Sequence, residues 1–258
     1  MYKIKMKLLE NDISNVPRIP ISIDDISDLP YIPKEPLPKK SFAMYIVGSP
    51  GSGKTNLLLS LMLSHPTKKR KNIPKYYWKY FDHIEVISGS LQTLPDRFLN
   101  KLPDEQLHNK YSDELLEEII EDMRAGENSN NLLILDDSIK DLKRSTILAK
   151  IFLNRRHCCH NSEKDGNGGL SIMTTSQKYN LLPLEVRLNQ SHYIIFKSSN
   201  RQEIDAVRNE LMTDLTKDEQ EELLEMCWSK PYSFLMIDVN KPKKDKYYCK
   251  FDKVVFEE

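Results

Sequence analysis

The sequence has no net charge, no long apolar run and few cysteines, and each absence excludes a class of protein. Its 38 basic residues are balanced by 38 acidic ones, whereas proteins that coat nucleic acid are strongly basic, so contact with nucleic acid would come from local patches. No apolar run approaches the roughly 20 residues of a membrane-spanning helix. We therefore expect no membrane association, and the N-terminus is too polar for a secretory signal. Four cysteines in 258 residues indicate reduced thiols in a cytosol-like compartment.

The first 40 residues differ in composition from the rest of the chain, because they hold six of its 14 prolines. Proline removes a backbone donor and fixes φ, which predicts an extended arm over residues 1–40 rather than a core element. The arm either wraps the domain or a neighbouring molecule, or is disordered. Residues 41–258 have the length of one large α/β domain.

The most informative stretch is Gly-Ser-Pro-Gly-Ser-Gly-Lys-Thr, which matches the phosphate-binding P-loop, or Walker A motif, G-x-x-x-x-G-K-[ST]. An apolar run of strand length precedes it and a Leu-rich helical segment follows, which is the context that this motif needs. Backbone N–H groups of such a loop surround phosphates, and the helix dipole adds to the attraction. The lysine would reach the β- and γ-phosphates and the threonine hydroxyl would bind Mg²⁺. The predicted nucleotide-binding residues are Gly48, Ser49, Pro50, Gly51, Ser52, Gly53, Lys54, Thr55 and Asn56.

A second motif follows a wholly apolar segment, Leu132 to Leu135, and consists of Asp136 and Asp137. Such a segment is typical of a buried parallel strand, and ligands bind beyond the carboxyl ends of parallel strands. Behind a P-loop, this pattern is a Walker B motif. Asp136 is then the predicted Mg²⁺ ligand together with Thr55, and Asp137 is the predicted base that polarises the attacking water.

Three arginines and one glutamine could complete a hydrolytic site. Arg155 and Arg156 end a predicted helix, where a guanidinium can reach the γ-phosphate held by a neighbouring subunit, and Arg187 is a second candidate for that role. Arg155 or Arg156 could instead form a surface pair with a carboxylate. Gln177 lies just past a predicted strand and could bind both the γ-phosphate and the attacking water.

Two other clusters favour structural explanations. The His157 to His160 block, His-Cys-Cys-His, lacks the spacing of a zinc site, because four consecutive residues cannot converge on one tetrahedral ion. The basic run Lys68 to Lys71 precedes four aromatic residues between Tyr76 and Tyr80. That combination can grip a nucleic-acid backbone, but a solvated loop entering a strand explains it more simply.

The periodicity predicts an α/β fold with a mostly parallel sheet, flanked by helices and extended by a C-terminal β-hairpin. The predicted strands span residues 42–47, 83–88, 132–135, 170–176 and 192–197, and the hairpin strands span 232–239 and 247–256. The predicted helices span residues 56–65, 112–124, 142–161, 200–212 and 216–228.

The order of these motifs resembles that of the FtsK–HerA superfamily of DNA-pumping ATPases, over roughly residues 40–256. The motifs are the P-loop, the Asp pair, Arg155-Arg156-His157, Thr174-Thr175-Ser176-Gln177, and Leu182-Pro183 to Arg187-x-Asn189. Within the superfamily the chain is most similar to the genome-packaging ATPases of large DNA viruses, virophages and related elements. Many relatives carry Glu where Asp137 stands, so the shorter side chain changes the geometry of the water.

The resemblance implies a RecA/ASCE-like P-loop NTPase fold, with the P-loop strand between the Gln177 strand and a later one. It implies an ATPase that uses ATP and Mg²⁺ to translocate double-stranded DNA into a capsid. The implied assembly is a homo-oligomeric ring of about five or six subunits around duplex DNA, docked on a capsid or portal component. The implied location is the cytoplasm of an infected host cell at the site of virion assembly, with the virion itself as a second location. Loops at Lys68–Lys71 and Asn161–Gly169 are candidate DNA contacts.

Two alternatives stay open. Other FtsK–HerA motors act in chromosome segregation or conjugation, but they usually add membrane or DNA-reading domains, for which 258 residues leave no room. Small-molecule or nucleotide kinases also begin with a P-loop. They need an Arg-rich lid and an acceptor pocket, and the Asp pair followed by a Gln-tipped strand favours hydrolysis.

Overall fold

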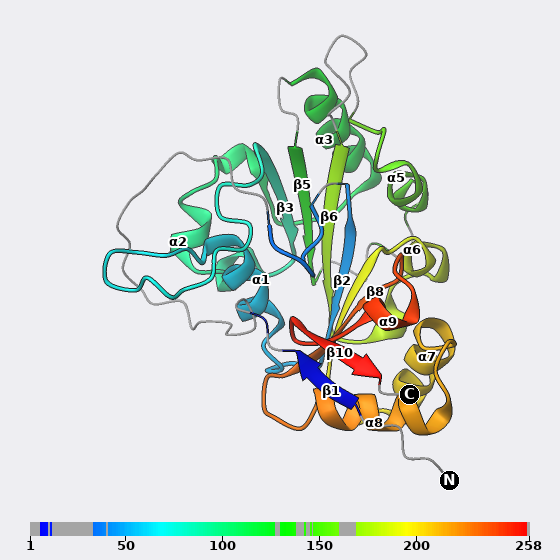
Figure 1. Ribbon diagram of the computed structural model, residues 1–258. Helices are drawn as coiled ribbons and strands as arrows, with labels where there is room; N and C mark the ends of the chain where they lie inside the picture. Colours follow the sequence, from blue (N-terminus) through cyan, green and yellow to red (C-terminus); the bar gives the residue numbers. More distant parts are fainter. Residues whose placement is uncertain are drawn as a thin grey trace.

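A ten-stranded sheet runs through the molecule, and helices cover both of its faces (Figure 1). The computed structural model describes residues 6–9, 11, 33–39, 41–126, 130–137, 142, 145, 147–159 and 169–256. The strand order is β1-β10-β9-β8-β7-β2-β6-β5-β3-β4. The strands are β1 (Met6–Leu9), β2 (Ala43–Val47), β3 (His83–Ser88), β4 (Leu107–His108), β5 (Asn130–Asp136), β6 (Gly169–Ser176), β7 (His192–Phe196), β8 (Phe234–Asp238), β9 (Tyr247–Cys249) and β10 (Asp252–Phe256).

The half of the sheet from β4 to β7 is parallel, and the half from β7 to β1 is antiparallel. The P-loop strand β2 lies between β6, which leads to Gln177, and β7. This confirms the predicted P-loop NTPase arrangement. The predicted C-terminal extension is also confirmed, but its second strand is divided into β9 and β10 by a turn in which Lys250 has a φ of 55°.

The helices lie in two layers, one on each side of the sheet (Figure 1). One layer holds α1 and α2, and the other holds α3, α5, α6, α7 and α8. The helices are α1 (Lys54–Leu63), α2 (Asp96–Leu99), α3 (Asp113–Ala125), α5 (Leu148–Asn154), α6 (Leu184–Leu188), α7 (Arg201–Leu211), α8 (Lys217–Cys227) and α9 (Lys243–Lys246), with short 3₁₀ turns at Leu91–Thr93, Asp104–Gln106 and Tyr179–Leu181. The predicted helix over 142–161 is seen as α5, and part of that range lies outside the described residues.

The alternation of side chains along β2 explains why the sheet needs both layers. Tyr45 and Val47 pack with α3, α7 and α8, whereas Met44 and Ile46 pack with α1. Successive side chains of a strand point to opposite faces, so a strand that is apolar at every position must be covered on both sides. The apolar sequence of β2 therefore places the P-loop at the centre of the sheet.

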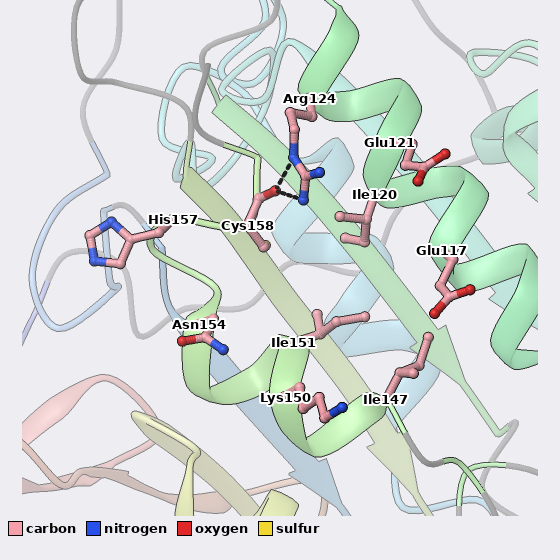
Figure 2. Close-up of a pocket in the computed structure, with 10 residues that line it drawn as sticks. All are labelled: Glu117, Ile120, Glu121, Arg124, Ile147, Lys150, Ile151, Asn154, His157 and Cys158. Carbon is pink, nitrogen blue, oxygen red and sulfur yellow. Dashed lines mark hydrogen bonds between the residues drawn. The ribbon is translucent and has the colours of Figure 1, made fainter. Parts of the chain in front are cut away.

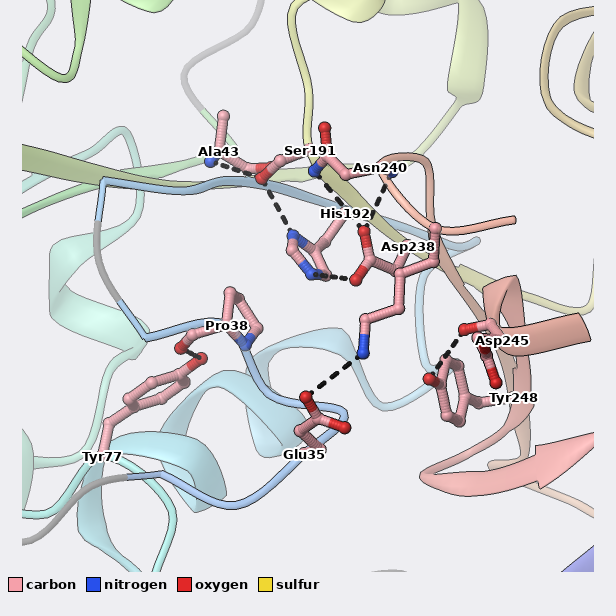
Figure 3. Close-up of polar contacts among 11 residues, drawn as sticks. Glu35, Pro38, Ala43, Tyr77, Ser191, His192, Asp238, Asn240, Asp245 and Tyr248 are labelled. Atoms are coloured by element: carbon pink, nitrogen blue, oxygen red, sulfur yellow. Dashed lines mark hydrogen bonds and ion pairs between the residues drawn. The ribbon is translucent and has the colours of Figure 1, made fainter. Parts of the chain in front are cut away.

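The described parts of the N-terminal segment contact the domain. Strand β1 pairs with β10, and Leu37 is only 2% exposed. Tyr77 Oη donates to the carbonyl oxygen of Pro38 at 2.9 Å (Figure 3). Lys241 forms a 3.2 Å ion pair with Glu35. These contacts attach residues 33–39 to the α1 side of the sheet.

Candidate active site

The P-loop connects β2 to α1 and wraps around its own lysine. Gly51 and Gly53 have φ values of 77° and 103°, a left-handed conformation that glycine adopts readily. Lys54 Nζ donates to the carbonyl oxygens of Gly48 at 2.6 Å and Ser49 at 3.2 Å. The lysine thus occupies the mouth of the loop, and Ser52 Oγ is buried with no hydrogen-bond partner among the described residues.

The charge of Lys54 is balanced by the Asp pair. Burial lowers the pKa of Lys54, and the negative charges of Asp137 and Asp136 oppose that decrease. Both carboxylates are therefore near enough to act on the ammonium group. The sequence places these residues more than 80 positions apart, and the parallel pairing of β2, β6 and β5 brings them to one edge of the sheet.

Asp136 is held in one orientation by the two neighbouring strands. Its side chain accepts a hydrogen bond of 2.6 Å from Thr175 Oγ1 on β6 and one of 3.1 Å from Ser88 Oγ on β3. The residue is 4% exposed. Sequence analysis assigned no role to Ser88 or to the Thr175 hydroxyl, although both are polar residues at the carboxyl ends of strands, which is the signal that could have identified them.

Asp137 and Gln177, the predicted base and the predicted γ-phosphate sensor, contact each other. Gln177 Nε2 donates to Asp137 Oδ2 at 3.0 Å, and both residues are exposed. The Asp137 N–H donates to Thr175 Oγ1 at 3.2 Å. Asp137 has a φ of 50°, which is uncommon for a residue with a side chain.

A sequence profile of the poxvirus A32 protein family matches residues 32–249. The chain belongs to this family. Its members are viral genome-packaging ATPases, and the predicted resemblance to viral FtsK–HerA-type packaging ATPases is confirmed. No match to a curated protein sequence was found.

Two solved structures are similar to this A32 family member. One is the genome packaging NTPase B204 from Sulfolobus turreted icosahedral virus 2 in complex with sulfate, with 16% sequence identity and a TM-score of 0.53 over 85% of this chain and 96% of that chain. The other is B204, the DNA-packaging ATPase from Sulfolobus turreted icosahedral virus, with 16% identity and a TM-score of 0.53 over 84% of this chain and 97% of that chain. At this identity the similarity concerns the fold, and it agrees with the P-loop NTPase class.

The three candidate arginines differ in what they contact. Arg187 is 8% exposed, and its Nη2 and Nε donate to Glu210 at 2.8 and 3.1 Å. Arg155 donates to the carbonyl oxygens of Ser41, Phe152 and Asn189. Arg156 is exposed. Arg187 and Arg155 are thus engaged within the subunit, while Arg156 faces solvent.

Arg155 and Arg156 lie far from the P-loop of their own subunit. The carbonyl oxygen of Arg155 accepts from the N–H of Leu170 at the start of β6, whereas the P-loop lies at the opposite end, where Val47 pairs with Ser176. Six residues of extended chain span about 20 Å. An arginine at this edge could therefore serve only a neighbouring subunit's phosphates.

The His157 to Cys159 segment lies beside a cavity of ≈ 450 Å³ between α3 and α5 (Figure 2). His157 is exposed, Cys159 is buried with its thiol 3.9 Å from Met123 Sδ, and the carbonyl oxygen of Cys158 accepts two hydrogen bonds from Arg124. His160 lies outside the described residues. The Cys158 and Cys159 thiols lie 3.8 Å apart, whereas His157 faces solvent.

Of the two predicted DNA-contacting segments, the structure describes the first, Lys68 to Lys71, in full. Lys68 to Lys71 are exposed, but Tyr76 and Tyr77 are core residues with 0% and 1% exposure. Trp78 stacks on His65 with 4.2 Å between the ring centres. These aromatic residues therefore serve packing, and the exposed basic residues Lys68 to Lys71 are the ones available to a partner. Positions 161–168 of the second segment lie outside the described residues.

A buried Ser-His-Asp group at the start of β7 and the end of β8 has a structural role (Figure 3). Ser191 Oγ donates to the carbonyl oxygen of Ala43 and accepts from its N–H, both at 3.0 Å. His192 Nδ1 lies 2.9 Å from Ser191 Oγ, and its Nε2 lies 3.3 Å from Asp238 Oδ2. Because the hydroxyl is bound to β2 and buried, this group joins strands and does not present a nucleophile.

In the described part of the chain, no helix is long and apolar enough to cross a membrane.

Proposed function

We propose that this protein hydrolyses ATP in the presence of Mg²⁺ to translocate double-stranded DNA into a viral capsid. The observation that carries the proposal is the convergence of Lys54, Asp136 and the Asp137–Gln177 pair at the carboxyl edge of the sheet. Solved relatives carry the description of DNA-packaging ATPase, and one was solved with ATP-gammaS.

The P-loop supplies the phosphate site. Lys54 contacts only the carbonyl oxygens of Gly48 and Ser49 in the hydrogen bonds described, which are weaker partners for an ammonium than phosphate oxygens. The unpartnered Ser52 hydroxyl is a further group that a phosphate oxygen would satisfy. Binding of a triphosphate would therefore move Lys54 from the loop carbonyls to the β- and γ-phosphates.

The residues around Asp136 suit Mg²⁺. Magnesium prefers oxygen ligands and usually combines one or two carboxylates with substrate phosphates and water. Asp136 would hold it, together with the Thr55 hydroxyl, and Thr175 and Ser88 would keep the carboxylate oriented. When bound, the ion would neutralise charge that develops on the phosphates.

Asp137 and Gln177 would prepare the attacking water. The Asp137 carboxylate would accept a proton from a water between it and the γ-phosphate, and the Gln177 amide would donate to the γ-phosphate when that group is present. The 3.0 Å contact between the two side chains would then be exchanged for contacts with substrate. That exchange would report the state of the nucleotide to β6.

A ring would complete each site with an arginine from the next subunit. Arg156 is the best candidate among the three, because it is exposed while Arg187 and Arg155 are engaged internally. We propose a homo-oligomeric ring of about five or six subunits in which this arginine faces a neighbour's γ-phosphate. The ring would encircle duplex DNA and dock on a capsid or portal component during virion assembly in the infected cell.

The proposal is tested by measuring ATP hydrolysis by the purified protein with and without linear duplex DNA. We expect phosphate release to water that duplex DNA stimulates. Lys54→Ala should abolish hydrolysis, because the phosphates lose their main cation. Asp137→Asn should bind ATP but lose turnover, because the amide cannot accept the proton.

Two results would contradict the proposal. Near-normal hydrolysis by Lys54→Ala would separate the activity from the P-loop. Transfer of phosphate to a nucleotide or other small acceptor, indifferent to DNA, would indicate a kinase instead.

A further inference from the structure

Tyr232 is an exposed aromatic residue that lies against the P-loop. Tyr232 is 68% exposed. It precedes β8 in a turn, where its φ is 59°. A Cβ built on Gly53 would lie 3.4 Å from Tyr232 Cδ1 and 3.7 Å from Phe196 Cε1. The ring of Tyr232 therefore borders the last glycine of the loop, immediately before Lys54.

The segment that carries Tyr232 is held at this edge by packing on both sides. Phe196 at the end of β7 pairs with Phe234 at the start of β8, and their rings lie 5.3 Å apart. Trp228 Nε1 donates to the carbonyl oxygen of Ile195 at 3.0 Å. The chain on either side of Tyr232 is thus packed against the sheet, although the Tyr232 ring itself faces solvent.

The position of Tyr232 relative to the catalytic carboxylates indicates what could cover it. Asp136 ends β5 and Asp137 follows it, on the β6 side of the P-loop, and Gln177 follows β6 itself. The γ-phosphate must point toward these groups. The other end of a nucleotide would then leave the loop on the β7–β8 side, where Tyr232 lies.

We propose that the Tyr232 ring is the platform on which the base of the bound nucleoside triphosphate stacks. This inference rests on the proposed function, because it assumes that the P-loop binds a nucleotide. A left-handed φ is unfavourable for a tyrosine, and such conformations are typical of residues that a site holds in a required position. Stacking accepts any base because every base has a π-face, so this contact would add affinity with little selectivity for adenine.

The test compares two ligands that differ in the base. Isothermal titration would measure the dissociation constants of ATP and of inorganic tripolyphosphate for the wild type, Tyr232→Ala and Tyr232→Phe. Loss of one stacking contact should weaken ATP binding by about tenfold. Tripolyphosphate has no base, so its binding to Tyr232→Ala should stay unchanged. Tyr232→Phe should bind ATP as the wild type does, because the ring is retained.

Leu184→Ala is a matched control, since Leu184 is 51% exposed and lies on α6. It should leave both dissociation constants unchanged. An equal loss for both ligands in Tyr232→Ala would show that Tyr232 supports the loop, and would overturn the proposal. Unchanged ATP binding would overturn it as well. If the wild type hydrolyses ATP in either case, only the stacking inference fails, whereas a wild type that binds neither ligand contradicts the proposed function too.

Discussion

At the scale of single residues, the orientation of Asp136 depends on hydroxyl groups from two other strands. Thr175 Oγ1 donates to Asp136 Oδ1 at 2.6 Å and accepts from the Asp137 N–H at 3.2 Å. One hydroxyl thus links the proposed Mg²⁺ ligand to the backbone of the proposed base. Partners of metal-binding carboxylates commonly matter nearly as much as the ligands themselves.

Thr175→Val should therefore lower turnover by about 10- to 100-fold and raise the Mg²⁺ concentration needed for half-maximal hydrolysis. Thr175→Ser should restore much of the activity, because it keeps the hydroxyl. The measurement is hydrolysis as a function of Mg²⁺ concentration.

Thr174→Val is the matched control on the same strand. Thr174 Oγ1 is buried without a hydrogen-bond partner among the described residues, so its removal should leave Mg²⁺ dependence unchanged. Equal effects of both valine variants would show that Thr175 acts only through packing.

The arginines allow a second prediction at this scale. Arg187→Ala would leave the partly buried Glu210 without its bidentate partner, and loss of hydrogen bonds to a charged group costs about 2 kcal/mol. Its free energy of unfolding in urea should fall accordingly. Arg156→Ala changes an exposed side chain and should alter stability by no more than about 0.5 kcal/mol, while turnover of the assembled ring falls by about 10³-fold.

If Arg187→Ala stays stable but loses turnover while Arg156→Ala stays active, then Arg187, and not Arg156, acts on the γ-phosphate of the neighbouring subunit. Sequence analysis could not separate the three arginines, because their spacing is equally suited to the role. Their burial and partners depend on contacts such as Arg187 with Glu210, which lie 23 positions apart and follow no motif.

At the scale of strands and helices, the β7–β8 pairing contains the buried His192–Asp238 contact. Burial raises the pKa of Asp238, but the hydrogen bond and charge of His192 and the Asn240 N–H outweigh burial, so the pKa lies below its ordinary value. An aspartate in the unfolded chain has a pKa of about 3.9. The stability from this contact is therefore fully present above about pH 4 and is lost as the pH falls through the lowered pKa.

Asp238→Asn should consequently make the free energy of unfolding less dependent on pH below about pH 4 than in the wild type. The measurement is urea unfolding at several pH values between about 2 and 6. Asp205→Asn, at an exposed position of α7, is the control and should keep the wild-type dependence. If the free energy of unfolding of Asp238→Asn falls below about pH 4 as it does in the wild type, the His192–Asp238 contact does not cause that loss of stability.

The elements that sequence analysis predicted well are those with a local signal. Strand β3 matches its predicted range, 83–88, and α3 agrees with the predicted helix over 112–124, since Ser112 caps it and accepts from the Leu115 N–H. Strands β1 and β4 were missed because they are short and depend on distant partners: Met6 of β1 pairs with Phe256, and Leu107 of β4 with Val86. The same reason explains the site, where the P-loop and Asp pair have motifs but the Thr175 contact depends on the β5–β6 register.

At the scale of the whole molecule, the proposed nucleotide-binding residues and the candidate arginines Arg155 and Arg156 lie at opposite ends of the parallel strands. The proposed nucleotide-binding residues lie at the carboxyl ends of β2, β5 and β6, and Arg155 lies at the amino end of β6. In a head-to-tail ring, one edge of a subunit can face the opposite edge of the next. The division into an arm at residues 1–40 and a domain at 41–258 stays a prediction, although residues 33–39 contact the domain.

The central claim is that ATP hydrolysis moves this protein along duplex DNA. It is tested most directly by the displacement of a triplex-forming third strand from linear duplex DNA. The account predicts displacement by the wild type with ATP and Mg²⁺, and none by Lys54→Ala or with a non-hydrolysable ATP analogue. Hydrolysis by the assembled wild-type protein without any displacement would contradict the account, because the energy of the nucleotide would then not be coupled to movement on DNA.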